Sequence, residues 1–284
     1  MTLIATWVAM DDNKEGKKPS SLYLAADSRI TYLDNSGTPI RTKDEMQKIF
    51  LSSKHPEMFA ICGDYDKCKG AVTGLIHNVD EGDFLLPHNS VEEKVAFIKN
   101  YFKSNFKPLL CNSVILYGTR VKDVLSLHQF IISDERVEVK MVPLGNSSRV
   151  VSWDGSGKKE FFNQWLDFNE NAQAFNEADT SRGAFRSIYE AIDKIGGPFV
   201  GGKMQAAALY RGHNTPHPIG IYYGDDCYLF GIKHTKTELN ESVEYRNSNF
   251  EIVDPRTGKI ADGAQRQPFA KDIVQRDIEK QLPS

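Results

Sequence analysis

Short apolar runs bounded by turn residues dominate the first quarter of the chain. Residues 2–10, 22–26, 48–51 and 59–62 are apolar stretches of the length and β-branched or aromatic content typical of buried strands. Residues 113–118, 125–132 and 137–142 form a second set, with a turn at 134–136. Because these three runs follow one another directly, the pattern predicts an antiparallel meander.

Helical patterns occupy the segments between the strand runs. Residues 66–76 form one candidate helix, and Ser90 can cap a second one from 91 to about 106. Two more, at 158–169 and 180–194, precede strand runs at 204–210, 219–223 and 227–232. The alternation of strands and helix pairs predicts an α+β fold in which two antiparallel sheets pack face to face with helices outside.

The last fifty residues have a different pattern. Residues 242–252 and 258–261 suggest a hairpin around a turn at 254–258, followed by a polar linker. Residues 268–282 have a helical pattern, with an apolar stripe formed by Phe269, Ile273, Val274, Ile278 and Leu282. We expect this extension to pack against the core of its own chain or against a neighbouring subunit.

Composition narrows the class of protein. A chain of 284 residues with 40% hydrophobic residues and a net charge of −3 can bury one large core and has no basic stripe for nucleic acid. Its four cysteines include no CxxC pair, which favours reduced thiols in the cytosol over a zinc site. The N-terminal run lacks the basic flank of a signal peptide and is too short to span a membrane. A soluble, cytoplasmic protein is expected.

Several polar motifs have ordinary explanations. Residues 154–159 hint at a phosphate loop, but Ser152 stands where its first glycine is needed and Lys159 where a Ser or Thr should bind magnesium. His213 and His217 lie in a proline-rich stretch without further ligands, and Asp225 and Asp226 suit a hairpin turn. The sequence therefore predicts no metal site and no cofactor.

Thr2 is the strongest candidate for chemistry. Removal of Met1 would make it an N-terminal threonine, whose free amine has a pKa of about 7.7–8.0 and can accept the proton of its own hydroxyl. Threonine is also frequent near the start of ordinary strands, so its place at position 2 does not by itself identify a catalytic residue. The motifs that follow Thr2 in the sequence are stronger evidence for a catalytic role.

Four short motifs come after Thr2 in a defined order: Ala25-Ala26-Asp27-Ser28-Arg29, Lys48 opening a strand, Cys62-Gly63, and Gly155-Ser156-Gly157. In this order they resemble the catalytic β subunits of the proteasome and their simpler bacterial relatives, within the N-terminal nucleophile (Ntn) hydrolase family. The resemblance covers about residues 2–234, with insertions at 11–21 and 31–47. It implies a four-layer αββα sandwich over residues 1–234 and a separate extension over 235–284.

The resemblance also implies a threonine peptidase and its site. Thr2 would be the nucleophile, and Lys48 would lower the pKa of its amine and hydroxyl while Asp27 keeps the lysine charged and oriented. The Gly63 N–H would bind the oxyanion, and Ser156 would either be catalytic or cap the helix that follows. As an isolated pair, Asp27 and Lys48 would be worth no more than about 1 kcal/mol on a surface. An apolar substrate pocket is expected from Ile30, Met46, Phe50, Ile61 and Tyr65.

Some positions depart from the family pattern. Gly197 and Val200 stand where an Asp and a Ser commonly hold the amine, Cys62 replaces a small residue, and Leu3 replaces a frequent second threonine. The alternatives are therefore an Ntn amidohydrolase for small amides, or an inactive scaffold or binding subunit. The expected partners are a peptide or unfolded protein substrate, further copies of the chain in a homo-oligomeric ring, and a separate unfolding partner. Neither nucleic acid nor a membrane is expected as a partner.

Overall fold

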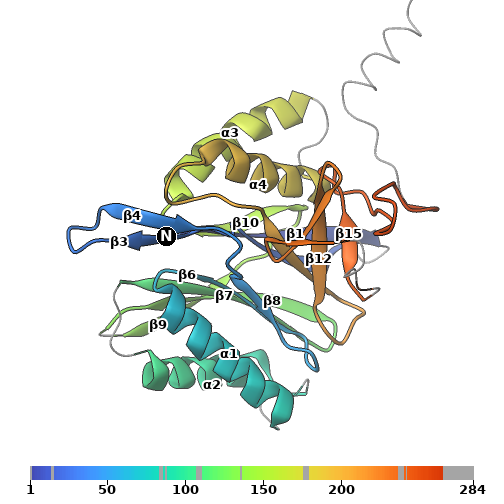
Figure 1. Ribbon diagram of the computed structural model, residues 1–284. Helices are drawn as coiled ribbons and strands as arrows, with labels where there is room; N and C mark the ends of the chain where they lie inside the picture. Colours follow the sequence, from blue (N-terminus) through green and yellow to red (C-terminus); the bar gives the residue numbers. More distant parts are fainter. Residues whose placement is uncertain are drawn as a thin grey trace, which may run out of the picture.

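The computed structural model describes residues 2–13, 16–82, 86, 88–106, 111–134, 136–174, 179–235, 240 and 242–264, with the side chains of residues 12, 13 and 169–174 left aside. Within these ranges the fold is mixed α+β, with three sheets and four helices (Figure 1). The expected α+β class is thereby confirmed.

The largest sheet contains the N-terminal strand near one edge. Its strands run in the order β10-β1-β2-β11-β12-β13-β14, and β15 pairs with β12. The bounds are β1 (Leu3–Asn13), β2 (Gly16–Ala26), β10 (Arg149–Gly155), β11 (Gln205–Tyr210), β12 (His217–Tyr223), β13 (Asp226–Leu229), β14 (Ile232–His234) and β15 (Glu244–Arg246). All these pairs are antiparallel except β12 with β15. The single run expected at 227–232 is two strands, because the chain turns at Phe230 and Gly231, both with positive φ.

The second sheet is a five-stranded meander in sequence order. It consists of β5 (Ile49–Leu51), β6 (Glu57–Cys62), β7 (Ser113–Val121), β8 (Val124–Ile132) and β9 (Val137–Val142). All its pairs are antiparallel, which confirms the predicted meander. The insertion at 31–47 contributes most of a separate two-stranded sheet, β3 (Ile30–Leu33) with β4 (Pro39–Lys43).

Helices lie on the outer sides of the two large sheets. In Figure 1, α3 (Lys158–Ala174) and α4 (Ser181–Ile195) lie on one side, and α1 (Tyr65–Glu81) and α2 (Val91–Asn105) on the other. Ser90 accepts a hydrogen bond from Glu93 N, and the Glu93 carboxylate accepts one from Ser90 N. This capping box satisfies two donors at the start of α2 and confirms the predicted cap.

Alternating side chains divide the core into layers. Along β1, Leu3, Ala5 and Trp7 pack with residues of α3 and α4, whereas Ile4 packs with the facing sheet. A further cluster, which includes Phe59, fills the space between β5–β9 and helices α1 and α2. Successive residues of a strand point to opposite faces, so the same strands build adjacent layers.

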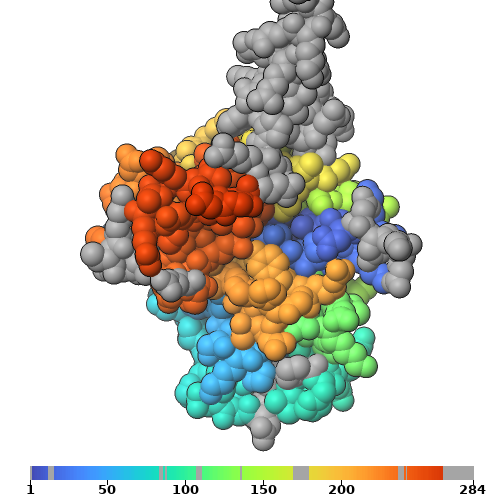
Figure 2. Space-filling view, turned by 90° about the vertical axis from the view of Figure 1, so that its right-hand side faces the viewer, coloured from blue at the N-terminus to red at the C-terminus, as the bar shows by residue number. Residues whose placement is uncertain are grey.

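The described part of the C-terminal segment packs on the main sheet. Phe250 joins the cluster around Trp7 and Tyr23, with ring centroids 5.8 and 5.6 Å away. The expected turn forms where Gly258 N donates to the Asp254 carbonyl at 2.8 Å. Figure 2 shows this red segment lying against the orange strands that precede it. The division at residue 234 stays a prediction, and the helix expected at 268–282 lies outside the described residues.

None of the helices within the described ranges combines the length and the apolar character needed to cross a membrane.

Candidate active site

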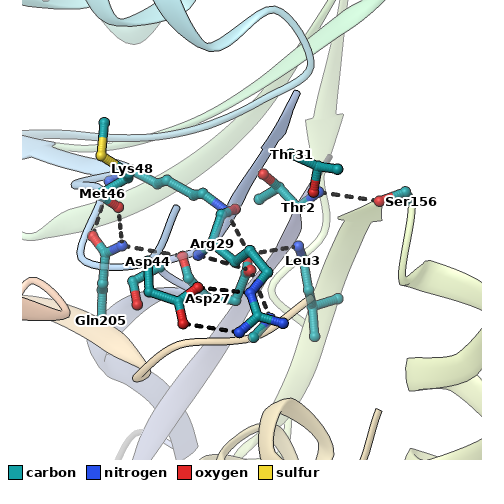
Figure 3. Close-up of polar contacts among 12 residues, drawn as sticks. Thr2, Leu3, Asp27, Arg29, Thr31, Asp44, Met46, Lys48, Ser156 and Gln205 are labelled. Carbon is teal, nitrogen blue, oxygen red and sulfur yellow. Dashed lines mark hydrogen bonds and ion pairs between the residues drawn. The ribbon is translucent and has the colours of Figure 1, made fainter. Parts of the chain in front are cut away.

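Thr2 lies buried at the start of β1, against the turn between β10 and α3 (Figure 3). Its backbone nitrogen donates to Ser156 Oγ at 3.1 Å. Gly155 makes this approach possible, because its φ is +112° and a Cβ there would lie 1.9 Å from the Thr2 carbonyl oxygen. The first intrahelical bond of α3 runs from Phe161 N to the Gly157 carbonyl, which places Gly157 at the cap position of the helix. The Ser156 hydroxyl, one residue earlier, accepts from Thr2 N.

Asp27 connects Thr2 to the rest of the site. It follows β2 directly and its side chain is fully buried. Its Oδ1 accepts from Leu3 N at 2.9 Å and from Lys48 Nζ at 2.7 Å. Its Oδ2 accepts from Arg29 N at 3.2 Å and from Gly201 N at 3.1 Å. Both oxygens are therefore occupied, which fixes the carboxylate beside the residue that follows Thr2.

Lys48 is equally buried and extends from the start of β5 toward Thr2 (Figure 3). Its ammonium also donates to the Arg29 carbonyl. Burial lowers the pKa of Lys48, while the charge and hydrogen bond of Asp27 oppose that shift. A lysine in this environment releases a proton more readily than an exposed one, and Asp27 fixes its direction.

Gly63 lies at the end of β6, next to the strand that begins after Lys48. Ile61 N donates to the Lys48 carbonyl at 2.9 Å, which brings the two chain segments together. The φ of Gly63 is +109°, and a Cβ there would lie 2.6 Å from backbone atoms of Asn112 and Ser113. Only glycine fits this tight turn. The preceding Cys62 is buried, and burial raises the pKa of its thiol, so it is a poor nucleophile here.

The pocket residues expected from the resemblance do not all lie on one side of the sheet. Ile30 is buried at the start of β3, Met46 is half-buried before β5, and Tyr65 is half-buried at the start of α1. Phe50 and Ile61 belong to the core beneath α1 and α2, and Tyr65 packs against the same cluster. Strand alternation directs Phe50 and Ile61 toward those helices, and a substrate pocket formed by these residues stays a prediction.

Gln205 is a buried residue at this site that sequence reasoning missed. Its Nε2 donates to the Asp27 carbonyl at 3.0 Å and to the Met46 carbonyl at 2.7 Å. Its Oε1 accepts from Lys48 N at 2.9 Å. The sequence marks it only as the second residue of an expected strand, so its role had no sequence signal.

Arg29 and Asp44 hold the late turn near the site. Arg29 Nε and Nη2 donate to the two Asp44 oxygens at 2.6 and 2.8 Å, and its Nη1 donates to the Gly197 carbonyl at 2.5 Å. Thr31 Oγ1 donates to the Pro198 carbonyl. The hydrogen bonds from Arg29 lower the pKa of Asp44. The turn is thus fixed by Arg29 and by Thr31, the first residue of the second insertion.

Val200 occupies this turn without offering a polar group. It is fully buried, and a Cβ on Gly157 would lie 2.4 Å from Val200 Cγ2. The next residue, Gly201, contributes its N–H to Asp27. In the described structure Thr2 N therefore donates to Ser156, while the late turn supports Asp27 through the Gly201 N–H.

The polar motifs set aside from the sequence have local partners. Asp154 Oδ1 accepts from Gly155 N at 2.7 Å, and Lys158 lies 3.4 Å from it. His213 Nδ1 and His217 Nε2 lie 2.7 Å apart. Among the residues for which positions are given, no cluster of three His, Cys, Asp or Glu could hold a metal ion.

Comparison with known proteins finds similarity of fold. No protein-family model matches the sequence, and no curated protein matches it significantly. Among solved structures, the chain resembles Anbu (ancestral beta-subunit) from Yersinia bercovieri, with a TM-score of 0.50, 13% identity, and coverage of 76% of this chain and 86% of that one. It also resembles the Anbu (Gly-1) mutant from Hyphomicrobium sp. strain MC1, with a TM-score of 0.50, 10% identity, and coverage of 100% and 99%.

These comparisons correct the family expected from the motifs. The assignment to proteasome β subunits or bacterial proteasome homologues is wrong, because no family model matches and the structural neighbours are Anbu proteins at 10–13% identity. What the neighbours support is a fold like that of the Anbu structures, matched loosely at a TM-score of 0.50. Four motifs of one to five residues were too few to carry a family assignment.

Proposed function

We propose that this chain is a threonine-type N-terminal nucleophile hydrolase that cleaves peptide bonds after removal of Met1. The observation that carries the proposal is the path that leads from the exposed Ser156 to the buried residues Thr2, Leu3, Asp27 and Lys48. Its hydrogen bonds are Thr2 N to Ser156 at 3.1 Å, Leu3 N to Asp27 at 2.9 Å and Lys48 to Asp27 at 2.7 Å. The helices on both outer sides of the two large sheets support an αββα arrangement as the scaffold of this site.

The chemistry follows from the groups at the start of β1. Thr2 Oγ attacks the carbonyl carbon of the peptide, and the freed Thr2 amine takes the hydroxyl proton and passes it to the leaving amine. The Gly63 N–H stabilises the oxyanion. Water then hydrolyses the ester and restores the hydroxyl. Proton transfer by a positioned amine and one oxyanion donor are each worth roughly two to three orders of magnitude in rate.

Lys48 and Asp27 have separate roles in this scheme. The positive charge of Lys48 stabilises the developing alkoxide of Thr2 and disfavours protonation of the neighbouring amine. Asp27 holds Lys48 in direction and anchors Leu3, the residue next to the nucleophile. Ser156 holds the Thr2 nitrogen.

The proposed substrate is an unstructured peptide with an apolar or aromatic residue before the cleaved bond. Ile30, Met46 and Tyr65 remain the candidates for that pocket. The fold neighbours are named ancestral β-subunits, which supports a homo-oligomer of this chain, with an unfolding partner as a further possibility to be tested by copurification.

An inactive scaffold is the second candidate, and one observation favours it. Val200 buries an apolar side chain at the late turn, where a polar group would be expected to hold the amine, and leaves Ser156 as the described acceptor for Thr2 N. A hydrolase for small amides would use the same nucleophile and differs only in substrate. Assays with unstructured protein and with small acyl amides separate those two activities.

The intact mass of the purified protein before and after incubation with a peptide epoxyketone tests the proposal. This reagent bonds to both the hydroxyl and the free amine of an N-terminal threonine. We expect loss of Met1 and a single adduct, retained in Thr2→Ser and absent in Thr2→Ala. Thr6→Val is the matched control, because it removes a buried hydroxyl from the same strand. Retention of Met1, or its loss without an adduct, would favour the scaffold.

A further inference from the structure

The geometry points to Gln205 as a positioning residue that sets Lys48 against Asp27, an inference that rests on the proposed hydrolase function. Gln205 begins β11, and its backbone is paired with Ala26 at the end of β2. Its side chain therefore starts from a fixed place in the sheet, next to the residue that precedes Asp27. It leads from there to the segment that carries Lys48.

The amide of Gln205 joins two segments that are distant in sequence. One Nε2–H bonds the Asp27 carbonyl at 3.0 Å and the other bonds the Met46 carbonyl at 2.7 Å, while Oε1 receives the Lys48 N–H at 2.9 Å (Figure 3). The Met46 carbonyl and the Lys48 N–H are thus connected to the Asp27 carbonyl by one rigid planar amide. The separation of the Lys48 and Asp27 main chains depends on the length of this amide.

Burial makes the arrangement specific. Gln205 has no exposed surface, so water does not replace its hydrogen bonds when the side chain is lost. Removing it would leave two carbonyls and one N–H unsatisfied next to a buried ion pair, and such groups rearrange to find partners. The expected movement is in the segment 46–48, which is held here by this side chain, by the bond from Met46 N to the Ser28 carbonyl and by the bond from Ile61 N to the Lys48 carbonyl.

Only an amide satisfies all three partners. A carboxylate of the same shape would direct an oxygen at the Asp27 and Met46 carbonyls, which it repels. A protonated carboxyl could donate to one of them. Gln205→Glu therefore has a predicted pH signature that a loss of packing alone does not produce, and Gln205→Leu keeps apolar volume without any hydrogen bond.

The test measures adduct formation with the peptide epoxyketone in wild type, Gln205→Leu, Gln205→Glu and a matched control, Gln47→Leu. Gln47 lies in the same segment, but its amide donates to the Ile49 carbonyl at 2.8 Å, two residues along the chain, and not to Asp27. The maximal rate at saturating reagent, the half-saturating concentration and the melting temperature are recorded for each protein from pH 5 to pH 9. The pH range brackets the ordinary pKa of an N-terminal amine, about 7.7–8.0.

A positioning role predicts a maximal rate lowered about 10- to 100-fold in Gln205→Leu, with the half-saturating concentration unchanged, since a displacement of about 1 Å can reduce the rate by 10²-fold. The rate of Gln205→Glu relative to wild type should rise as the pH falls, and Gln47→Leu should react like wild type. Equal maximal rates in wild type and folded Gln205→Leu, with only a lower melting temperature in the variant, would overturn the role of Gln205 alone. A wild type without any adduct would overturn the proposed function itself.

Discussion

Two buried lysine–carboxylate pairs lie in the described part of the chain, and their surroundings differ. Lys48 meets Asp27 at 2.7 Å beside the start of β1, and Lys94 meets Glu57 at 2.5 Å beneath α2. All four side chains are almost fully buried. In distance and burial the two pairs are nearly alike.

Their remaining hydrogen bonds distinguish them. Asp27 accepts from three backbone N–H groups, one of which belongs to Leu3, next to Thr2. Glu57 accepts instead from the Tyr117 hydroxyl, and Lys94 donates to Thr119 at 3.2 Å. The second cluster is thus closed by side chains of the core, whereas the first is connected to Leu3, the neighbour of the proposed nucleophile Thr2.

The comparison teaches that a buried ion pair is not in itself an active site. Burial raises the pKa of Glu57, and burial together with Glu57 raises the pKa of Tyr117, yet nothing in that cluster reaches a nucleophile. Perturbed pKa values identify candidates, and the neighbouring groups decide among them. The following changes test this difference between the two pairs.

Lys48→Met should have the largest effect. It removes the charge next to Thr2, and the maximal rate of epoxyketone addition should fall by about 10²- to 10⁴-fold. Stability should fall by only about 1–3 kcal/mol, because Asp27 keeps its three backbone donors. Rates and urea denaturation are measured on the same samples, with the exposed Lys158→Met as control. An unchanged rate would remove Lys48 from the mechanism.

Lys94→Met should act in the opposite way. It leaves the buried Glu57 carboxylate without its cation, and the free energy of unfolding should fall by about 3–5 kcal/mol. The rate of adduct formation per folded molecule should stay unchanged. The pKa of Glu57 is already raised above 4.5, and loss of the lysine raises it further. The folded state then binds a proton more tightly than the unfolded state, so the stability of the variant should decrease as the pH rises above about 4.5.

Denaturant titrations of Lys94→Met at pH 4.5 and pH 7.5 measure both effects. A variant that is equally stable at the two pH values would contradict the raised pKa of Glu57. A slower reaction of the folded variant would contradict the separation of the two pairs.

The double variant Glu57→Gln with Lys94→Met tests whether the ionic interaction of this pair is required for stability. It removes both charges and leaves an amide oxygen to accept from Tyr117 and an amide group to donate to Thr119. Replacing a buried ion pair as a whole is often neutral, so stability should return to within about 1–2 kcal/mol of wild type. Calorimetric unfolding measures this recovery. A double variant no more stable than Lys94→Met would mean that the ionic interaction itself is required.

Asp44→Asn should have the smallest effect. Arg29 lowers the pKa of Asp44, so this carboxylate stabilises the folded state above its ordinary pKa of 3.8, and the contribution is lost as the pH falls through the lower folded value. The pair is partly exposed, so the loss in Asp44→Asn should be below about 1 kcal/mol. Melting temperatures of wild type and variant should differ at pH 6 and converge below pH 3.8. A difference that grows in acid would contradict this assignment.

Local sequence patterns determined most of the elements of this protein. The meander over β7–β9, the cap at Ser90 and the helices α3 and α4 follow from alternation, capping and helical periodicity within a few residues. Cys62 and Gly63 were recognised as a strand end because glycine permits the turn there. Such features depend on neighbours in sequence, which is why they can be read without the fold.

The contacts between distant segments were decided by the tertiary structure alone. Gln205 bonds to residues 157 to 178 positions away, Phe50 and Ile61 pack in the core beneath α1 and α2, and β15 joins the main sheet in parallel. The sequence proposed Thr2, Asp27, Lys48, Gly63 and Ser156 as one site. Only the fold shows that Thr2 is bonded to Ser156 and linked through Leu3 and Asp27 to Lys48, because these hydrogen bonds require strand ends to meet in space.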